Sequence, residues 1–288
     1  MNAARFLLIG PAESGKTSFL AAFWIHANGA EDAALSVSCH PEDSSYLDEL
    51  QRAWLSFTKV PRTSAGTDRL VELEVIRKTD RAVVSLAIPD LSGETFGEIW
   101  THRHWSTEFQ ILLDGAGGAL LFVNPEKIED GVTLMDVAEL QAQLPNDQLP
   151  AANLQQNLVP TSFDITRAPT QIQLIDSLQL IAESGKLRQP FRLGLIVSAW
   201  DTVIATQRAA TPLSWLKTRM PALISYLAHN STVFDWKIFG VSAQGVDYDK
   251  LTPQLESTPP YARCQVAVEG AADTKDITVP VEWLIGRG

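Results

Sequence analysis

The chain is organised around one stretch, Gly10-Pro11-Ala12-Glu13-Ser14-Gly15-Lys16-Thr17. The apolar run Phe6-Leu7-Leu8-Ile9 precedes it, and a helical pattern over residues 18–24 follows it. A glycine loop between a strand and a helix is the context that the phosphate-binding motif G-x-x-x-x-G-K-[ST] requires. We therefore predict a nucleotide phosphate site here, with an ordinary strand-to-helix turn as the alternative.

The residue types of this loop match the chemistry of a phosphate group. The glycines let the backbone curl so that N–H groups point at phosphate oxygens, and the start of the helix adds its positive dipole end. Lys16 is expected to bring a charge to the β- and γ-phosphates, and the Thr17 hydroxyl to hold Mg²⁺. Since the loop binds through its backbone, the Glu13 side chain is expected to face solvent. The predicted nucleotide-binding residues of the loop are Gly10, Glu13, Ser14, Gly15, Lys16, Thr17 and Ser18.

The composition narrows the class of partner. The 288 residues are 45% hydrophobic, enough to bury one large core or two modest ones. A formal net charge of −11 argues against a broad basic surface for nucleic acid. Cys39 and Cys264 make no metal-site or disulfide framework, and no run approaches the roughly 20 apolar residues of a membrane span. We expect a protein of the reducing cytoplasm, with no nucleic-acid partner and no membrane span.

Apolar runs and helical patterns alternate along the chain. Strands are expected at residues 4–9, 34–38, 70–76, 82–88, 118–124, 193–197, 236–241 and 264–268. Helices are expected at residues 16–27, 46–57, 171–182, 212–229 with a break at Pro221, and 279–285. One domain covers 1–288, with a partly flexible insertion at about 129–168 and a C-terminal extension at about 246–288. This order predicts an α/β fold with a doubly wound, mostly parallel sheet and one antiparallel hairpin strand.

An aspartate followed by a glycine stands at the end of the second hairpin strand, in Pro89-Asp90-Leu91-Ser92-Gly93-Glu94. Ligands of open α/β sheets lie outside the carboxyl ends of the strands, so Asp90 and the phosphate loop should face the same crevice. We expect Asp90 to hold Mg²⁺ through water and the Gly93 N–H to sense a γ-phosphate. The alternative is that Asp90 caps the next helix.

Taken together, these motifs resemble those of the P-loop GTPases of the Ras-like and translation-factor class. Residues 10–17 match the phosphate loop, and Asp90-Leu91-Ser92-Gly93 matches D-x-x-G. Thr63 lies where the family has the switch I threonine that binds Mg²⁺ and the γ-phosphate. Ser198-Ala199-Trp200-Asp201 stands in the place of [NT]-K-x-D, the guanine reader, and Ser242-Ala243-Gln244 in the place of S-A-K.

The resemblance runs from residue 4 to about 245 and implies a switch protein that binds GTP and GDP with Mg²⁺. It implies that Asp201 reads the base beside Ser242 and Ala243, and that Thr17, Asp90 and Thr63 complete the metal site. More narrowly, the chain resembles the divergent prokaryotic double-GTPase group. The features that it shares with this group are the Val-Ser-Ala-Gln-Gly segment, the long insertion and the closing Pro-Val-Glu-Trp-Leu. That group is thought to act in multi-gene conflict or defence systems.

Two departures from the family pattern bear on activity. Ala199 replaces the lysine that lies over the guanine ring; Trp200 could support the base instead, or could be core. Glu94 stands where Ras-like enzymes have the glutamine that orients the attacking water. A glutamate accepts a hydrogen bond from water but cannot donate one. With Lys16, Gly93 and Glu94 as the candidate catalytic residues, we expect slow GTP hydrolysis or hydrolysis completed by a partner.

Residues Phe96 to Phe109 would form switch II. Their aromatic side chains are candidates for a nucleotide-sensitive surface that anchors a protein partner, or for simple packing against the sheet. A metal site at His102 and His104, or an arginine finger at Arg103, is a weaker alternative.

Two other functions stay open on the sequence. One is a P-loop ATPase or small-molecule kinase, although the 129–168 insertion carries only Arg167 where a kinase lid usually brings several arginines. The other is a pseudo-GTPase that works as an interaction scaffold, which the residues at Ala199 and Glu94 allow.

Overall fold

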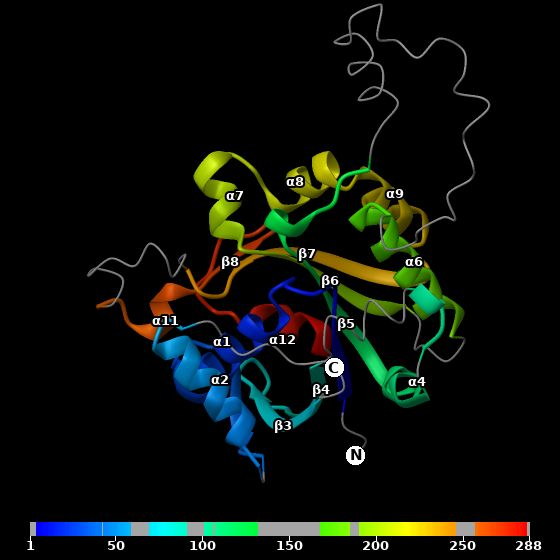
Figure 1. The fold of residues 1–288 in the computed structure, drawn as a ribbon. Coiled ribbons are helices and arrows are strands. Elements are labelled where there is room, and N and C mark those ends of the chain that lie inside the picture. The colour runs from blue at the N-terminus through cyan, green and yellow to red at the C-terminus, as the bar shows by residue number, and fades with distance from the viewer. Residues whose placement is uncertain are drawn as a thin grey trace, which may run out of the picture.

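The computed structural model describes residues 4–41, 43–58, 69–90, 101–105, 107–131, 168–184, 190–245 and 257–286. Within them an eight-stranded sheet has the order β2-β3-β4-β1-β5-β6-β7-β8 (Figure 1). The strands are β1 Ala4–Ile9, β2 Leu35–Cys39, β3 Arg69–Arg77, β4 Val83–Asp90, β5 Ala116–Val123, β6 Phe191–Ser198, β7 Phe234–Ser242 and β8 Gln265–Val268. The helices are α1 Lys16–Gly29, α2 Ser45–Leu55, α4 Thr107–Asp114, η1 Pro125–Lys127, α6 Thr170–Glu183, α7 Trp200–Thr206, α8 Pro212–Arg219, α9 Pro221–His229, α11 Pro260–Arg263 and α12 Val279–Ile285.

The strand directions confirm the predicted α/β fold with a mostly parallel sheet. Five neighbouring strands, β4, β1, β5, β6 and β7, run parallel to one another. β3 is antiparallel to both β2 and β4, and β8 is antiparallel to β7. Two strands, β3 and β8, therefore run against the majority, where the sequence predicted one. Each strand expected from the sequence has a counterpart, including the short segments at 34–38 and 264–268.

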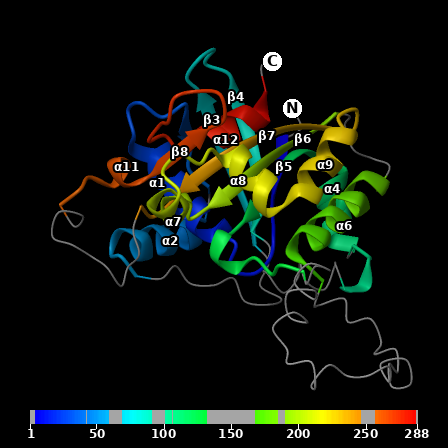
Figure 2. The same ribbon diagram turned by 90° about the horizontal axis from the view of Figure 1, so that it is seen from above.

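Helices cover both faces of the sheet (Figures 1 and 2). Each face carries its own apolar core. Alternate residues of a strand point to opposite faces, so Phe6 and Leu8 of β1 pack with α1, α2 and α12. Leu7 and Ile9 pack instead with α4, α6, α7, α8 and α9. This burial on both faces explains why β1, β5 and β6 are continuous apolar runs rather than alternating ones. In β3, by contrast, apolar and polar residues alternate, because one face of the strand is open and the side chains of Glu72 and Glu74 are exposed.

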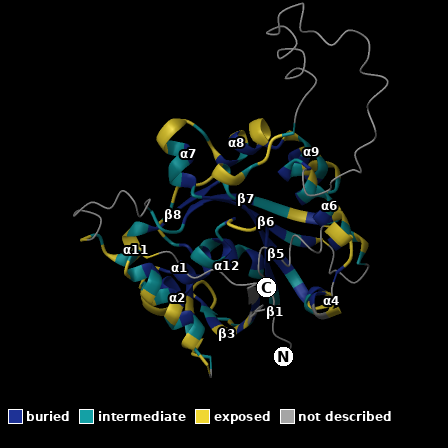
Figure 3. Cartoon of the chain, viewed as in Figure 1, coloured by how far each residue is buried: buried dark blue, intermediate teal, exposed yellow. Residues whose placement is uncertain are grey.

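Helix α1 is buried on all sides. Every residue from Phe19 to Ala27 is buried, so α1 has no polar face, whereas α2 buries a stripe of Leu47, Leu50 and Trp54 (Figure 3). A helix that is apolar all round must be enclosed by protein. The sheet covers one side of α1, and further cover comes from α2 and the segment before α12.

The segment before α12, residues 274–278, contacts the strands at both lateral edges of the sheet. Thr274 forms a bridge with Val266 of β8, at one edge. At the other edge the Asp276 carboxylate accepts a hydrogen bond from the Ala34 N–H at 2.6 Å, and the Thr278 hydroxyl accepts one from the Leu35 N–H of β2 at 3.2 Å. Both edge strands, β2 and β8, are therefore partly covered, which limits their capacity to pair with strands of other chains.

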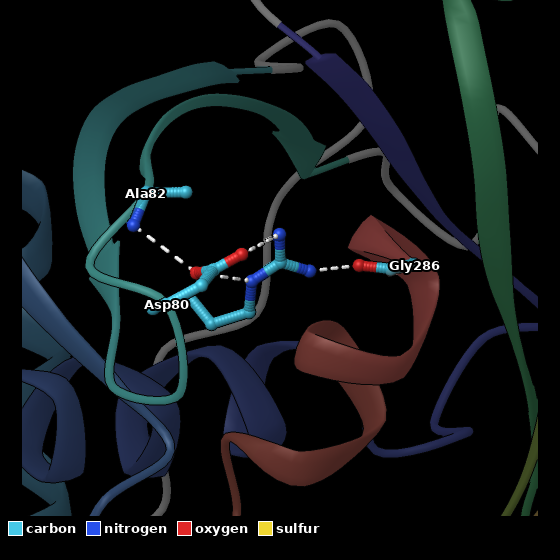
Figure 4. Close-up of polar contacts among 4 residues, drawn as sticks. Asp80, Ala82 and Gly286 are labelled. Atoms are coloured by element: carbon cyan, nitrogen blue, oxygen red, sulfur yellow. Dashed lines mark hydrogen bonds and ion pairs between the residues drawn. The ribbon is translucent and has the colours of Figure 1, made fainter. Parts of the chain in front are cut away.

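The last helix is fastened to the β3–β4 turn (Figure 4). Buried Arg77 donates to Asp80 through Nε and Nη2, at 3.0 and 2.8 Å, and through Nη1 to the carbonyl of Gly286. The Arg77 guanidinium holds the pKa of the Asp80 carboxyl below its ordinary value. Arg192 of β6 also contacts this helix, lying over the Trp283 ring at 4.4 Å. The predicted C-terminal extension is thus part of the core where the structure describes it.

The predicted helix at 212–229 is broken before Pro221, where α8 ends and α9 begins. Most of the predicted insertion, residues 132–167, lies outside the described residues. In the described part of the chain, none of the helices combines the length and apolarity needed to cross a bilayer.

The buried His26 side chain of α1 makes stability depend on pH. Burial lowers the pKa of His26 from 6.5 to about 4, against a smaller opposing effect of Asp276. The unfolded chain therefore binds a proton near pH 6.5 that the folded protein does not bind until about pH 4. We expect the free energy of unfolding to fall by at most about 3 kcal/mol between these pH values. Urea unfolding of the parent and His26→Phe from pH 7 to 4 should show a flatter profile for the variant; identical profiles would contradict this account.

Candidate functional site

The phosphate loop crosses the carboxyl ends of the central parallel strands. Gly10 has a φ of 146°, and a Cβ on it would lie 2.7 Å from the carbonyl oxygen of Phe122 on β5. Gly15 has a φ of 95°, and a Cβ there would lie 3.0 Å from Cβ of Ser198 on β6. Both positions require glycine, for backbone conformation and for space. The two glycines of the motif therefore seat the loop directly on β5 and β6.

Lys16 is held inside this loop. Its side chain is buried, and Nζ donates to the carbonyl oxygens of Gly10 at 2.8 Å and Pro11 at 2.9 Å. Gly15 at the start of α1 offers no side chain to cap the first N–H groups of the helix. The Ser14 hydroxyl is buried and finds no hydrogen-bond partner among the described residues. A lysine ammonium, uncapped helix N–H groups and an unpartnered hydroxyl fit an anionic group with several acceptor oxygens.

The remaining loop residues are placed as follows. Glu13 is exposed, as predicted, but it also forms an ion pair with Lys127 at 2.6 Å. Thr17 is half-buried in the first turn of α1. The Ser18 hydroxyl accepts a hydrogen bond from Nε2 of Gln244 at 3.3 Å, which links α1 to the loop after β7.

The metal-site residues are only partly described. Asp90 is the last residue of β4 and pairs in register with Leu8 of β1, two residues before the phosphate loop. The backbone thus places Asp90 at the end of the strand next to the one that leads into the loop. Thr63, Gly93 and Glu94 lie outside the described residues. In the described part of the chain, His, Cys, Asp and Glu residues form no group of three or more that could hold a metal ion.

The two segments predicted to read a base lie on adjacent strands. β6 and β7 pair in parallel up to Ser198 and Val241. Both segments therefore emerge at the carboxyl ends of the parallel strands, where the phosphate loop also lies. The buried Ser242 hydroxyl accepts a hydrogen bond from the Asp201 N–H at 2.8 Å. This bond fixes the first turn of α7 against the end of β7. Asp201 itself is half-buried, and its carboxylate stands at the start of the helix.

The structure decides the role of Trp200 in favour of packing. Its indole is 1% exposed and belongs to the core beneath α7. A Cβ on Gly240 would lie 2.5 Å from Cδ2 of the Trp200 ring, so the ring rests on the bare backbone of β7. Ala199, with a φ of 45°, makes the sharp turn that aims Trp200 into the core. The support for a base that Trp200 could have offered in place of the missing lysine is therefore not available.

Helix α2 supplies a contact that the sequence analysis missed. Nε1 of the buried Trp54 donates to the carbonyl of Ala243 at 2.9 Å, and Sγ of Cys264 contacts the same oxygen at 3.3 Å. Burial raises the pKa of the Cys264 thiol to about 12, which keeps it protonated as a donor. Trp54 falls within the helix predicted at 46–57, but its polar partner lies 189 residues away along the chain. No local pattern could have indicated this pairing.

The described part of switch II is divided between exposed residues, 101–104 and 107, and two buried aromatic residues. Trp105 and Phe109 are buried and stack with ring centroids 4.2 Å apart, which supports packing for these two residues. Arg103 pairs with Asp176 of α6 at 2.8 Å, and His102 and His104 are exposed. Residues 96–100 lie outside the described part of the chain.

Several solved structures are similar to this chain at low identity. The signal recognition particle receptor SRb-GTP/SRX complex from Chaetomium thermophilum matches at 15% identity and a TM-score of 0.43, over 84% of this chain and 92% of that one. The Arl6 BBS3 small GTPase from Trypanosoma brucei matches at 11% identity and a TM-score of 0.37, over 99% and 96%. Roco2 RocCORdC of Methanosarcina barkeri bound to GDP matches at 12% identity and a TM-score of 0.36, over 88% of this chain and 49% of that one.

A comparison with curated protein sequences found no significant match. The sequence profile of one protein family, by contrast, matches residues 7–284, which include the phosphate loop, Asp90, Asp201, the Ser242-Ala243-Gln244 segment and α12 up to Leu284. The narrower of the two resemblances drawn from the sequence is thereby confirmed: the chain belongs to the Double-GTPase 1 family.

Proposed function

We propose that this protein is a guanine-nucleotide switch that binds GTP and GDP with Mg²⁺ and hydrolyses GTP slowly or with the help of a partner. One observation carries the proposal. The loop that holds buried Lys16 and the hydrogen-bonded pair of Asp201 and Ser242 both lie at the carboxyl ends of the parallel strands of one sheet. A nucleotide needs a phosphate site and a base site at this edge, because ligands of α/β sheets bind outside the carboxyl ends of the strands.

The base preference follows from the hydrogen-bonding groups at this edge. Guanine presents two donors, N1–H and the 2-amino group, next to the O6 acceptor. The Asp201 carboxylate is an acceptor for both donors, and the backbone N–H of Ala243 is a donor suited to O6. Adenine would place its N1 acceptor against the Asp201 carboxylate, which is also an acceptor. Its 6-amino donor would face the Ala243 N–H, which is also a donor. This complementarity supports guanine over adenine, even though Ala199 supplies no cation above the ring.

The phosphates and Mg²⁺ of the nucleotide would be bound by the phosphate loop, the start of α1 and the end of β4, together with Thr63. Lys16 and the N–H groups around Gly15 would bind the β- and γ-phosphates, with the Ser14 hydroxyl as a further donor. Thr17, Asp90 and Thr63 would hold Mg²⁺, which would neutralise charge between the phosphates. The Gly93 N–H would respond to the γ-phosphate, and loop ordering by that phosphate would create or remove a surface for a protein partner on residues 96–109.

Glu94 makes slow hydrolysis the expected behaviour. A glutamate in the place of the water-orienting glutamine accepts a hydrogen bond from water but donates none, and its charge would lie close to the phosphates. A partner chain could complete the site, in keeping with a role in a multi-gene prokaryotic conflict or defence system. The competing functions are an ATPase or small-molecule kinase, and a catalytically inactive scaffold; base preference and turnover separate them from a GTPase.

Asp201 offers the sharpest test of base recognition. Calorimetry with Mg²⁺ should give tight binding of GTP and GDP and weak binding of ATP to the parent. Asp201→Ala should weaken GDP binding by at least about a hundredfold, because two hydrogen bonds to a charged acceptor are lost. Asp201→Asn should favour xanthosine diphosphate instead, since its amide can donate to the 2-oxo group. Equal binding of ATP by the parent, or no binding at all, would refute guanine recognition.

Gly240 tests whether the packing beneath Trp200 positions Asp201. Gly240→Ala puts a methyl group into the Trp200 ring, so it should lower the free energy of unfolding by about 1–3 kcal/mol and weaken GDP binding. Gly117→Ala is the matched control on β5, because its Cβ would lie 3.6 Å from the nearest side-chain atom, an ordinary contact. Unchanged GDP affinity in a folded Gly240→Ala protein would separate Trp200 packing from base recognition.

Glu94 is tested by single-turnover GTP hydrolysis. Glu94→Gln removes a charge near the phosphates and restores a donor for the attacking water, so the rate should rise about tenfold, the value of one hydrogen bond. GDP affinity should stay the same, which shows that the site is intact. An unchanged rate would remove Glu94 from the mechanism.

A further inference from the structure

The middle of the phosphate loop adopts a backbone conformation that its residue does not favour. Glu13 has a φ of 59°, in the left-handed region. In this region the Cβ of a non-glycine residue crowds the backbone, so surrounding contacts must hold it there. Glu13 lies between the two glycines of the loop, and a change in its backbone would redirect the N–H groups on either side of it. The contacts that hold Glu13 therefore control the shape of the phosphate site.

Asn124, the residue after β5, supplies the first of these contacts. Its Nδ2 donates to the Glu13 carbonyl oxygen at 2.9 Å. Its Oδ1 accepts from the Glu126 N–H at 3.0 Å and caps the 3₁₀ helix η1. Only one orientation of the amide satisfies both bonds, so the side chain is fixed while it holds the loop. Asn124 thus joins the loop to the end of a central strand.

Lys127, the last residue of η1, supplies the second contact. Its Nζ lies 2.6 Å from Oε2 of Glu13. This ion pair offsets a negative charge on the loop that is expected to bind anionic phosphates. η1 also packs beside α7, the helix that follows Ala199.

We propose that Asn124 and Lys127 are positioning residues for the phosphate loop. Asn124 holds the Glu13 backbone in its left-handed conformation, and Lys127 neutralises the Glu13 carboxylate. Together they support from the end of β5 the nucleotide site that Ala199 leaves without its lysine. The proposal rests on the proposed nucleotide binding, and neither residue belongs to the phosphate-loop motif.

The test is rescue by glycine at position 13. Calorimetry with GDP and Mg²⁺ should show that Asn124→Ala weakens binding roughly fivefold, the value of one hydrogen bond. Lys127→Met should weaken it by about threefold at low salt, and less at high salt. Glycine adopts the left-handed conformation without strain and carries no charge, so neither contact is needed in Glu13→Gly, whose own GDP affinity is the reference for this background. In the Glu13→Gly background, both further substitutions should cost less than about twofold.

Two controls separate this role from general stability. Asn28→Ala removes a similar bond, from Nδ2 to the Trp24 carbonyl at 2.8 Å, at the far end of α1 and should leave GDP affinity unchanged. Lys217→Met removes an exposed lysine on α8 and should do the same. If the parent binds GDP but Asn124→Ala and Lys127→Met bind equally well, or if Glu13→Gly rescues neither, the positioning role is wrong and the proposed function stands. If the parent binds no nucleotide, both are overturned.

Discussion

The burial of α1 on every side is the constraint on which the rest of the structure depends. A helix with no polar face cannot lie on a surface, so the sheet, α2 and the segment before α12 must enclose it. The N-terminus of the helix, at Gly15 and Lys16, lies at the carboxyl ends of the parallel strands. The uncapped N–H groups and the ammonium of this rigid helix are thereby presented at a fixed place. The phosphate loop leads into the N-terminus of a helix whose middle, residues 19–27, is core.

The candidate site is then assembled by strands that end at the same edge. β1 leads into the loop, β4 carries Asp90 beside it, and β6 and β7 carry the predicted base-reading segments. Hydrogen bonds fasten the pieces together: Trp54 and Asn124, from outside these motifs, hold Ala243 and Glu13, and Ser242 of one base-reading segment holds Asp201 of the other. Each of these bonds joins segments far apart in the chain. The geometry of the site thus depends on the packing of the whole sheet.

The departures from the family pattern have a common structural setting. Trp200 is committed to the core over Gly240, so the turn at Ala199 serves packing rather than contact with a base. Lys127, on η1 after β5, forms an ion pair with Glu13 of the phosphate loop. Buried Trp105 and Phe109 similarly show that part of the aromatic switch II segment is core.

The sequence by itself determined the class of fold, the order of its elements and the residues of the phosphate loop. Apolar periodicity and the glycine spacing are local properties, so strands such as residues 4–9 and the helix after Lys16 could be predicted from neighbours in the chain. Only the tertiary structure decided that Trp200 is core, that Trp54 holds Ala243 and that Asn124 holds Glu13. These outcomes depend on which side chains the curled sheet brings together across tens to hundreds of residues. No local pattern encodes such distances, because they follow from the packing of both cores at once.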